Sequence, residues 1–338
     1  MNSQPPLRAA VLGTGSWGTT FAAVLADAGT AVTMWGRRPE VCEQITSDHR
    51  NEEYLPGKAL PHAITATTDI AAALKDADLV VLALPAQSVA AKLNEIADIW
   101  PTGAIAVSLM KGVELGTHRR MSEVVANSLG LPAEQICVIS GPNLAPEIAA
   151  GHPTATVVAS SSQATAELVA RACANSYFRP YTNLDVVGVE LCGAVKNVIA
   201  LAVGVAAGMG FGDNTKATLI TRGLAETTRL GLALGADLET FAGLAGMGDL
   251  VATCSSPLSR NYSLGMRVGQ GQTLEEAIRS TGQTAEGVKS SQSVLELAQS
   301  VSVDTPITQA IVAVLHQGLP VRDMAELLLA RPRKREGQ

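Results

Sequence analysis

The sequence predicts an α/β fold, with a doubly wound parallel sheet in the N-terminal part and an all-α domain in the C-terminal part. In the first half, short apolar runs typical of buried strands alternate with helical patterns, as in a parallel sheet with helices on both faces. From about Val189 the strand signals fade, and long runs rich in Ala, Leu and Gly indicate helices. We therefore expect one domain at residues 1–188 and a second at residues 189–338.

The elements of the first half follow from these runs. The expected strands are Ala9–Leu12, Ala31–Trp35, Leu79–Leu84, Ile105–Leu109, Ile136–Ile139 and Thr156–Ala159. The expected helices are Thr19–Ala28, Val41–Ser47, Ile70–Leu74, Val89–Ile99, Met121–Leu129 and Ala164–Ala174. Ligands of such sheets bind beyond the carboxyl ends of the strands, so a site is expected in the loops that follow them.

The second half is expected to be helical throughout, after a boundary near residues 185–188. Its expected helices are Glu190–Gly208, Lys216–Leu234, Leu238–Ala242, Asn261–Val268, Thr273–Ser280, Ala285–Gln299, Ile307–His316 and Met324–Ala330. Apolar helices in this half could form the face of a homodimer.

Composition and charge exclude several classes of protein. The 338 residues are 47% hydrophobic and 17% charged, as in a well-packed soluble enzyme. The net charge of −6 argues against a nucleic-acid partner, and the apolar run Val198–Ala207 is too short for membrane insertion. The N-terminus shows no secretory leader pattern, and the five cysteines lie far apart, so we expect a cytoplasmic protein with reduced thiols. The five histidines show no ligand spacing, and no metal is expected.

The first expected strand runs directly into the glycine-rich turn Gly13-Thr14-Gly15-Ser16-Trp17-Gly18. Gly13 permits a tight turn, Gly15 lets a pyrophosphate approach the backbone, and Gly18 lets the next helix pack close to the strand. The helix N-terminus offers unpaired N–H groups and a partial positive charge to the phosphates. GxGxxG between a strand and a helix predicts a Rossmann-like dinucleotide-binding domain.

The end of the second expected strand indicates which dinucleotide is bound. NAD-specific sites often place an acidic residue there, to hold the ribose 2′-hydroxyl. This chain has Arg37 and Arg38 instead, and guanidinium groups suit a 2′-phosphate. We expect NADPH as the preferred cofactor. NADH stays open, because both arginines could be solvated surface residues.

Lys196 lies within the apolar helical run 191–200. A buried lysine needs a task or a partner, and burial lowers its pKa, which makes it a credible proton donor and acceptor near neutral pH. The alternative is a lysine whose stem lies on apolar surface while its ammonium group reaches water.

Two loops after expected strands carry further candidates. Lys111 follows Ile105–Leu109 and could contact a phosphate or a carboxamide, unless it is an ordinary loop lysine. Gly141 and Asn143 lie in the loop Ser140–Ala145, whose N–H groups, with the Asn143 side chain, could bind an anion. The alternative for this loop is a plain turn.

The helical half adds three candidate segments. Asp249 ends a glycine-rich loop that begins at Gly243. Ser259, Arg260 and Asn261 stand at an expected helix start and suit a phosphate pocket, although Ser259 could simply cap the helix. Glu286 could accept a hydrogen bond from a ribose or an amide, or be an exposed acid at a helix start.

Five segments in order carry a family resemblance. They are GTGSWGTT at 13–20, MKGVE at 110–114, SGPNLAPEIAAG at 140–151, GAVKNVIALAVG at 193–204, and LAGMGDL with SRN within 244–261. Through them the chain resembles the bacterial-type NAD(P)-dependent sn-glycerol-3-phosphate dehydrogenases, from Ala9 to about Leu329. The resemblance implies reversible hydride transfer between NADPH or NADH and dihydroxyacetone phosphate, which forms sn-glycerol 3-phosphate for phospholipid synthesis.

The resemblance also assigns roles to residues. It implies Lys196 as the proton donor or acceptor. We add the hypothesis that Asp249 and Asn197 orient Lys196. The implied substrate contacts are Lys111, Gly141, Asn143, Lys196, Asp249, Ser259, Arg260 and Asn261. Besides the glycines of the turn, the implied cofactor contacts are Ser16, Trp17, Arg37, Arg38, Lys111, Ala145, Arg260, Thr284 and Glu286.

The chain departs from the family pattern at three positions of one loop. Asn143 stands where the family usually has Ser or Thr, and Leu144 and Pro146 replace a common aromatic and a common basic residue.

Two other functions stay open. The first is a hydroxyacid or ketopantoate-type reductase of the same architecture, which would not prefer a phosphorylated substrate. The second is a non-catalytic NADP(H)-binding sensor, which would not need the apolar helix that contains Lys196.

Overall fold

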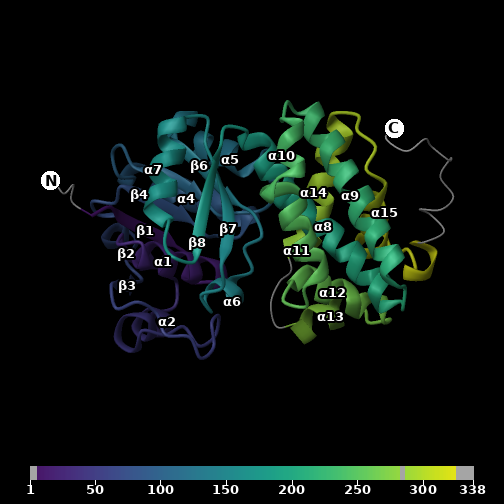
Figure 1. The fold of residues 1–338 in the computed structure, drawn as a ribbon, viewed down its shortest axis with the longest axis horizontal. Helices are drawn as coiled ribbons and strands as arrows, with labels where there is room; N and C mark the ends of the chain where they lie inside the picture. The colour runs from purple at the N-terminus through teal and green to yellow at the C-terminus, as the bar shows by residue number, and fades with distance from the viewer. Residues whose placement is uncertain (1–5, 282–285, 325–338) are drawn as a thin grey trace.

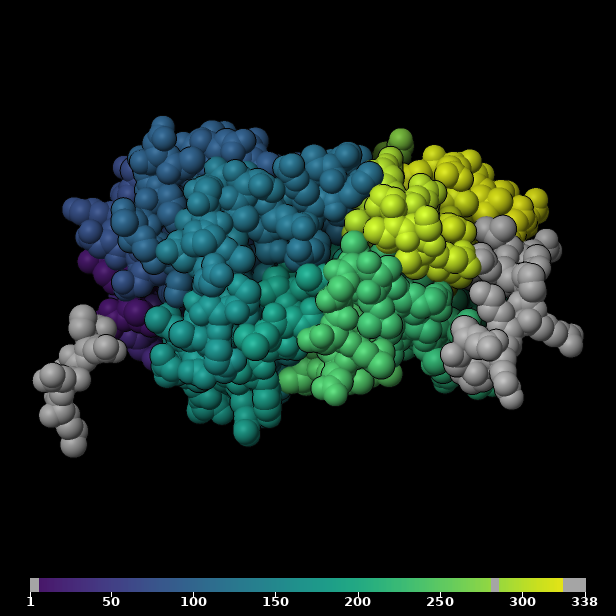
Figure 2. Space-filling model, turned by 90° about the horizontal axis from the view of Figure 1, so that it is seen from above, coloured from purple at the N-terminus to yellow at the C-terminus, as the bar shows by residue number. Residues whose placement is uncertain are grey.

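The computed structural model describes residues 6–281 and 286–324. Figure 1 shows two parts side by side along the long axis, one built around a sheet and one built of helices. Figure 2 shows the same two parts from above. The residues up to about Asn183 form the first part, and α8 (Val186–Gly208) begins the second.

An eight-stranded sheet forms the first part, with the strand order β3-β2-β1-β4-β5-β6-β7-β8. Its strands are β1 (Arg8–Leu12), β2 (Ala31–Trp35), β3 (Ile64–Thr67), β4 (Leu79–Leu82), β5 (Ile105–Ser108), β6 (Ile136–Ser140), β7 (Thr154–Ala159) and β8 (Phe178–Asn183). Neighbouring strands from β3 to β6 run parallel to each other. The expected doubly wound α/β architecture is therefore confirmed.

The far edge of the sheet differs from the expected parallel arrangement. β7 is antiparallel to β6, and β8 is parallel to β7. The connection from β6 to β7 contains only the short helix α6 (Ala145–Ile148), which is too short to serve as a crossover helix, so the chain turns back beside β6. β3 and β8 were not expected, because neither shows the apolar run of a buried strand: only one of the four side chains of β3 is buried, and most side chains of β8 are not buried.

Helices cover both faces of the sheet. They are α1 (Ser16–Asp27), α2 (Pro39–Glu43) with the π-helical turn Gln44–Asp48, α3 (Ile70–Leu74), α4 (Val89–Ile96), α5 (Met121–Leu129), α6 and α7 (Gln163–Cys173). Val11 of β1 packs toward α1 and α7, whereas its neighbour Leu12 packs toward α3, α4 and α5. Because successive strand side chains point to opposite faces, a sheet covered on both sides needs apolar residues at every position.

A bundle of helices around α8 forms the second part. The other helices are α9 (Asp213–Ala233), α10 (Leu238–Ala242), the π-helical turn Leu244–Gly248, α11 (Asp249–Ser255), α12 (Arg260–Gly269), α13 (Leu274–Thr281), α14 (Glu286–Ser300) and α15 (Pro306–His316). Within the described ranges no strand follows β8, so the all-α second part is confirmed. The short helix α11 was not expected, and the helix expected at 324–330 lies almost wholly outside the described residues.

Helix α8 lies in the middle of this bundle. It packs against α9, α11, α12, α14 and α15, and its side chains are buried from Gly188 to Ala206. Among the described residues it is the one helix long and apolar enough to cross a membrane, but 89% of its apolar window is buried inside the protein. Burial on all sides is typical of a core helix.

Candidate active site

The glycine-rich turn after β1 has the geometry that a pyrophosphate requires. Gly13 has a φ of 124°, and a Cβ there would lie 2.4 Å from the carbonyl oxygen of Ala83, so only glycine fits. A Cβ on Gly15 would meet nothing within 4 Å, which leaves this backbone open to a ligand. Gly15 is the N-cap of α1 and has no capping side chain, so the N–H groups that begin with Ser16 and Trp17 are available to an anion.

Other groups around this turn also fit a dinucleotide. The indole Nε1 of Trp17 is buried and has no hydrogen-bond acceptor among the described residues, so it suits an oxygen of a ligand. A Cβ on Gly18 would lie 2.5 Å from the carbonyl oxygen of Gly13, which shows how closely α1 packs on the turn. Thr20 Oγ1 donates to the carbonyl oxygen of Ala145 over 3.5 Å and ties α1 to α6.

The two arginines beyond β2 lie in different environments. Arg37 is exposed. Arg38 Nη1 lies 2.6 Å from Glu53 Oε2, and its guanidinium carbon lies 5.7 Å from the centre of the Tyr54 ring. The hydrogen bond between Glu53 and Arg38 raises the pKa of Arg38 and lowers the pKa of Glu53. A 2′-phosphate at this corner would meet one exposed guanidinium group and one that is already ion-paired.

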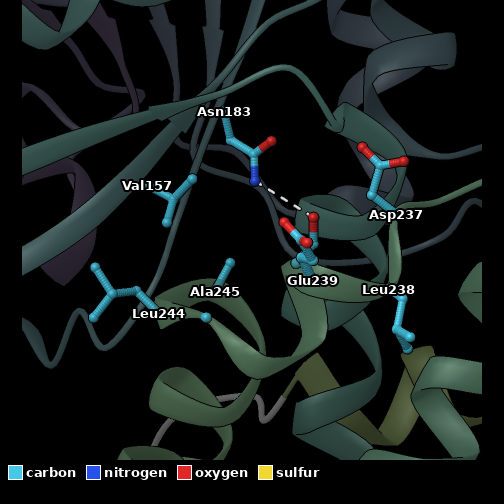
Figure 3. Close-up of a pocket in the computed structure, with 9 residues that line it drawn as sticks. Val157, Asn183, Asp237, Leu238, Glu239, Leu244 and Ala245 are labelled. Atoms are coloured by element: carbon cyan, nitrogen blue, oxygen red, sulfur yellow. Dashed lines mark hydrogen bonds between the residues drawn. The ribbon is translucent and has the colours of Figure 1, made fainter.

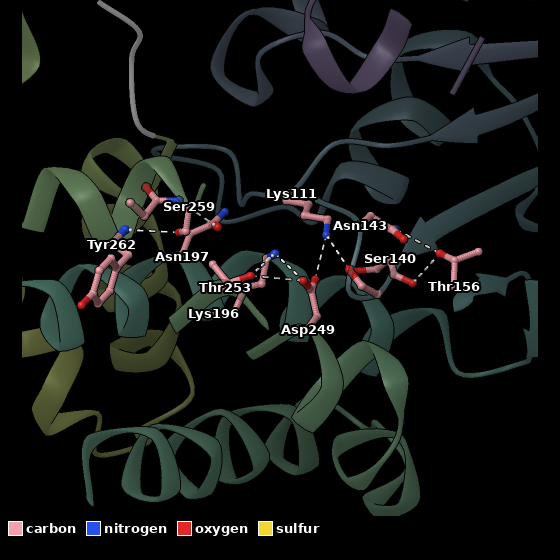
Figure 4. Close-up of polar contacts among 12 residues, drawn as sticks. Lys111, Ser140, Asn143, Thr156, Lys196, Asn197, Asp249, Thr253, Ser259 and Tyr262 are labelled. Atoms are coloured by element: carbon pink, nitrogen blue, oxygen red, sulfur yellow. Dashed lines mark hydrogen bonds and ion pairs between the residues drawn. The ribbon is translucent and has the colours of Figure 1, made fainter. Parts of the chain in front are cut away.

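Three of the sequence-predicted residues form a buried ion-pair cluster between the two parts (Figure 4). Lys196 Nζ, on α8, lies 2.5 Å from Asp249 Oδ1 and donates to Thr253 Oγ1 over 2.7 Å. Lys111 Nζ, in the loop after β5, lies 2.7 Å from Asp249 Oδ2 and 3.4 Å from the carbonyl oxygen of Gly141. One carboxylate thus joins the carboxyl edge of the sheet to the helical part.

Burial and charge set the protonation of this cluster. Burial lowers the pKa of Lys196 to about 8; Lys111 acts in the same direction, and Asp249 opposes both. Burial disfavours the charge of Asp249, but the two ammonium groups outweigh it and hold the pKa of this carboxyl below its ordinary value. Lys196 can therefore lose and regain a proton near neutral pH beside a permanent anion. Its ammonium group bonds to buried side chains, so the alternative of a lysine that reaches water does not describe it.

The loop after β6 presents a hydrogen-bond acceptor, the side-chain oxygen of Asn143. Asn143 Nδ2 donates to Thr156 Oγ1 over 3.0 Å, and Thr156 Oγ1 donates to the carbonyl oxygen of Ser140 over 3.1 Å. Asn143 Oδ1 is buried without a partner among the described residues. Gly141 has a φ of 145°, which shapes the turn beside Lys111. One N–H of the amide is engaged by Thr156, and the buried oxygen suits a hydroxyl or amide donor of a ligand.

The start of α12 lies beside α8 and contributes Arg260 and Asn261. Asn261 Nδ2 donates to Asn197 Oδ1 over 3.0 Å, and Asn261 Oδ1 accepts from the N–H of Gly287 over 2.9 Å. The Asn197 oxygen is thus bound to Asn261, and the expected contact from Asn197 to Lys196 is not formed. Ser259 Oγ accepts from the N–H of Tyr262 and caps α12, which is the simpler role considered for it.

Glu286, the first residue of α14, belongs to the same electrostatic environment. Burial raises its pKa, whereas Arg260, Lys111 and Lys196 act in the opposite direction. The side chain is partly buried, so Glu286 is more than an exposed acid at a helix start. Thr284 lies outside the described residues.

Close helix packing brings α12 to the cluster. A Cβ on Gly204 of α8 would lie 2.1 Å from the carbonyl oxygen of Tyr262, and a Cβ on Gly265 of α12 would lie 2.2 Å from that of Leu201. The two helices therefore contact each other backbone to backbone, and larger residues at these glycines would push Arg260 away from Lys196.

A separate hollow of about 480 Å³ lies where β7 and β8 meet α10 (Figure 3). It is lined by Val157, Asn183, Asp237, Leu238, Glu239, Thr240, Gly243, Leu244 and Ala245. Asn183 Nδ2 donates to Thr240 Oγ1 over 3.4 Å across it. The predicted site residues that the structure describes do not line this hollow, so it is distinct from the Asp249 cluster.

Sequence reasoning missed three side chains that support the site. Thr253 accepts from Lys196, and Thr156 accepts from Asn143. Asn51 Nδ2 donates to the carbonyl oxygen of Thr14 and to Thr19 Oγ1, both over 2.9 Å, and so braces the glycine-rich turn. A helix at 249–255 would have placed Thr253 one turn after Asp249, but the sequence gives no local signal for Thr156 or Asn51.

Comparison with known proteins agrees with this geometry. Two family models match: the one described as NAD-dependent glycerol-3-phosphate dehydrogenase N-terminus covers residues 8–166, and the corresponding C-terminus covers residues 185–326. The chain is 59% identical to glycerol-3-phosphate dehydrogenase [NAD(P)+] of Streptomyces griseus, over 98% of this chain and 99% of that protein.

Solved structures separate the family from more distant folds. The crystal structure of glycerol-3-phosphate dehydrogenase from Coxiella burnetii superposes with a TM-score of 0.92 at 36% identity, over 96% of this chain and 99% of that one. A PanE/ApbA family ketopantoate reductase structure from Ralstonia eutropha, at 15% identity and a TM-score of 0.57 over 94% of this chain and 100% of that one, shares the fold alone. The chain belongs to the NAD-dependent glycerol-3-phosphate dehydrogenase family.

Proposed function

We propose that the chain catalyses the reversible reduction of dihydroxyacetone phosphate to sn-glycerol 3-phosphate with NADPH or NADH, and so supplies glycerophospholipid synthesis. The observation that carries this proposal is the buried Lys196–Asp249–Lys111 cluster, which lies at the carboxyl edge of a dinucleotide-type sheet. Relatives that are more than half identical over nearly their whole length bear the corresponding enzyme name, which supports the same activity here. In this proposal residues 1–188 bind the cofactor and residues 189–338 bind the substrate.

Lys196 performs the proton transfer. When held at the glycine-rich turn 13–18 and the start of α1, a reduced nicotinamide dinucleotide would supply the hydride for the carbonyl carbon. The Lys196 ammonium group stabilises the negative charge that develops on the carbonyl oxygen and donates a proton to it, which completes the alcohol. In the oxidation direction the neutral amine accepts that proton. Asp249 holds Nζ of Lys196 in place, 2.5 Å from its carboxylate.

Arg260 and Asn261 bind the substrate phosphate, together with N–H groups at the start of α12. This phosphate lies away from the reacting carbon, so its binding energy can position the carbonyl and raise turnover as well as affinity. Lys111 places a second cation beside the carbonyl. The other proposed substrate contacts are Gly141, Asn143 and Ser259, and the proposed cofactor contacts are Gly13, Gly15, Ser16, Trp17, Gly18, Arg37, Arg38, Lys111, Ala145, Arg260 and Glu286.

The first experiment follows nicotinamide absorbance after mixing the protein with dihydroxyacetone phosphate, with NADPH and NADH in parallel. Lys196→Ala should lose most turnover while NADPH binding persists, because Lys196 acts on the substrate and not on the cofactor. Lys216→Ala, which removes a lysine from the outer face of α9, is the matched control. Near-normal turnover of Lys196→Ala would remove this residue from the mechanism.

The same assay with unphosphorylated dihydroxyacetone tests the substrate class. A preference for the phosphorylated compound supports the Arg260 pocket, whereas equal rates would point to a hydroxyacid-type reductase. Protein that binds NADPH but oxidises it with neither compound would point to the sensor. We also propose that the protein is cytoplasmic and forms a homodimer. Analytical ultracentrifugation tests the oligomeric state.

A further inference from the structure

The corner beyond β2 holds a carboxylate that the sequence pattern alone did not single out. Glu53 lies in the segment between the π-helical turn 44–48 and β3, fifteen residues after Arg38. Its Oε2 lies 2.6 Å from Nη1 of Arg38, and Glu40 adds a second carboxylate 3.9 Å from Nε of the same guanidinium group. With Arg37, the corner contains two cations and two anions, so its formal charges cancel.

The segment that carries Glu53 is held in place. Asn51, which is buried, bonds to the glycine-rich turn through the carbonyl oxygen of Thr14 and to α1 through Thr19 Oγ1. The N–H of Leu55 donates to the carbonyl oxygen of Asn51 over 2.8 Å, and the Leu55 side chain is buried. Glu53 lies between these two anchors, so its carboxylate stays at the corner.

This arrangement bears on the choice between NADPH and NADH. A 2′-phosphate is recognised by guanidinium forks, and its negative charge is repelled by nearby carboxylates. The carboxylate of Glu53 occupies part of the Arg38 fork and cancels its charge, so a 2′-phosphate must share or displace it. A ribose without the 2′-phosphate has no such competitor.

We propose that Glu53 is a specificity-determining residue, which weakens the preference for NADPH over NADH by holding Arg38 as an ion pair. The proposal rests on the cofactor site described above. It implies that the two arginines, despite the absence of an acidic residue at the end of β2, do not make the protein strictly NADPH-dependent.

Glu53→Gln tests the proposal directly. The side chains of the pair are 41% and 50% exposed, so solvent screens their interaction and the effect should be moderate. We expect adenosine 2′,5′-bisphosphate to bind about three- to fivefold more tightly to the variant in titration calorimetry. Binding of 5′-AMP should stay within about twofold of the wild-type value.

Glu167→Gln is the matched control. Glu167 is also 50% exposed and also faces an arginine, Arg171 at 3.9 Å, but it lies on α7. It should leave the affinities of both nucleotides unchanged. In an Arg38→Ala background most of the gain from Glu53→Gln should disappear, because Glu53 acts through Arg38.

Three results would overturn the proposal. The first is an unchanged affinity of Glu53→Gln for adenosine 2′,5′-bisphosphate, and the second is a gain in that affinity that persists fully in the Arg38→Ala background. The third is weaker binding of 5′-AMP to Glu53→Gln, which would make Glu53 a direct ribose ligand. These differ from failure of the proposed function, in which the wild-type protein would bind neither NADPH nor NADH. A thermal melt without ligand confirms that each variant is folded.

Discussion

Replacing Asp249 by Asn should shift the pH dependence of the reduction, because Asp249 raises the pKa of Lys196. In the wild-type protein burial lowers that pKa to about 8, Lys111 acts in the same direction, and Asp249 opposes both. The amide keeps the shape of the carboxylate but removes a negative charge 2.5 Å from Lys196 Nζ. The pKa of Lys196 should therefore fall further.

The size of the shift follows from the charges. Two unit charges about 4 Å apart attract each other by about 4 kcal/mol at an effective dielectric constant of about 20. One pKa unit corresponds to about 1.4 kcal/mol, so an attraction of this size corresponds to about three units in the pKa of Lys196. Thr253 still accepts from Nζ, and we expect a fall of about two units. At pH about 7.5 the fraction of Lys196 in the ammonium form then drops about 25-fold.

The assay is kcat/KM for dihydroxyacetone phosphate reduction as a function of pH. Reduction consumes the proton of the ammonium group, so the wild-type value should fall as pH rises through about 8, while the oxidation rate rises over the same range. In Asp249→Asn the falling limb should lie about two units lower. Asp213→Asn, which removes an exposed acid paired with Lys216, should leave the profile unchanged.

A folded Asp249→Asn protein whose falling limb stays at about pH 8 would refute this account of Lys196. Loss of one partner of a buried ion pair can destabilise a protein by about 3–5 kcal/mol. If this variant does not fold, Thr253→Val provides a milder test. It removes an acceptor 2.7 Å from Lys196 Nζ and should shift the limb in the same direction.

Three further predictions concern substrate binding and stability. Arg260→Ala should lower kcat/KM for dihydroxyacetone phosphate by about 10- to 100-fold at saturating NADPH, and should lower the value for unphosphorylated dihydroxyacetone much less. An equal loss for both compounds, or a like effect of Arg267→Ala on the same helix, would argue against a phosphate contact. Glu226→Ala removes a buried carboxylate that accepts from the N–H groups of Ile307 and Thr308 at the start of α15. It should lower the free energy of unfolding, measured by urea titration, by about 2–4 kcal/mol. The control Glu239→Ala removes an exposed acid and should change this free energy little. Gly265→Ala should destabilise the folded protein by at least about 2 kcal/mol, because the new Cβ would lie 2.2 Å from the carbonyl oxygen of Leu201. The control is Gly212→Ala, whose Cβ would meet nothing within 4 Å. Equal melting temperatures of the two variants would contradict the close packing of α8 and α12.

Local patterns were sufficient to predict much of the fold. The strand–GxGxxG–helix unit is contiguous, so its spacing alone indicated a turn, and the structure shows that turn with an open backbone at Gly15. β8 could not be predicted, because Arg179, Tyr181 and Thr182 are exposed and its pattern lacks the apolar runs of a buried strand. The reversal at β7 follows from the short connection after β6, whereas the apolar runs that predicted the strands carry no information on strand direction.

The site was predictable as a set of residues but not as an arrangement. Lys196 and Asp249 are 53 positions apart, and Lys111 and Asp249 are 138 apart, so no local spacing links them. The sequence accordingly left two interpretations of Lys196, and the tertiary contacts decide between them. In the same way, it could not show that Arg38 is paired with Glu53, and this pairing changes what the two arginines imply about the cofactor.

In the proposed mechanism Lys196 acts in both directions of one reaction, and the charges of the cluster are the reason why a buried lysine can do so. Two ammonium groups share one carboxylate, so the cluster keeps one net positive charge when Lys196 is protonated and becomes neutral when it is not. The charged form suits a developing alkoxide, and the neutral form can accept a proton from an alcohol. Gly193 makes this arrangement possible, because a Cβ there would lie 2.9 Å from Ser140 Oγ and 3.4 Å from the Lys111 side chain. A larger residue at this position would push the sheet away from α8. It would thereby separate Lys111 from the Asp249 carboxylate that both lysines share.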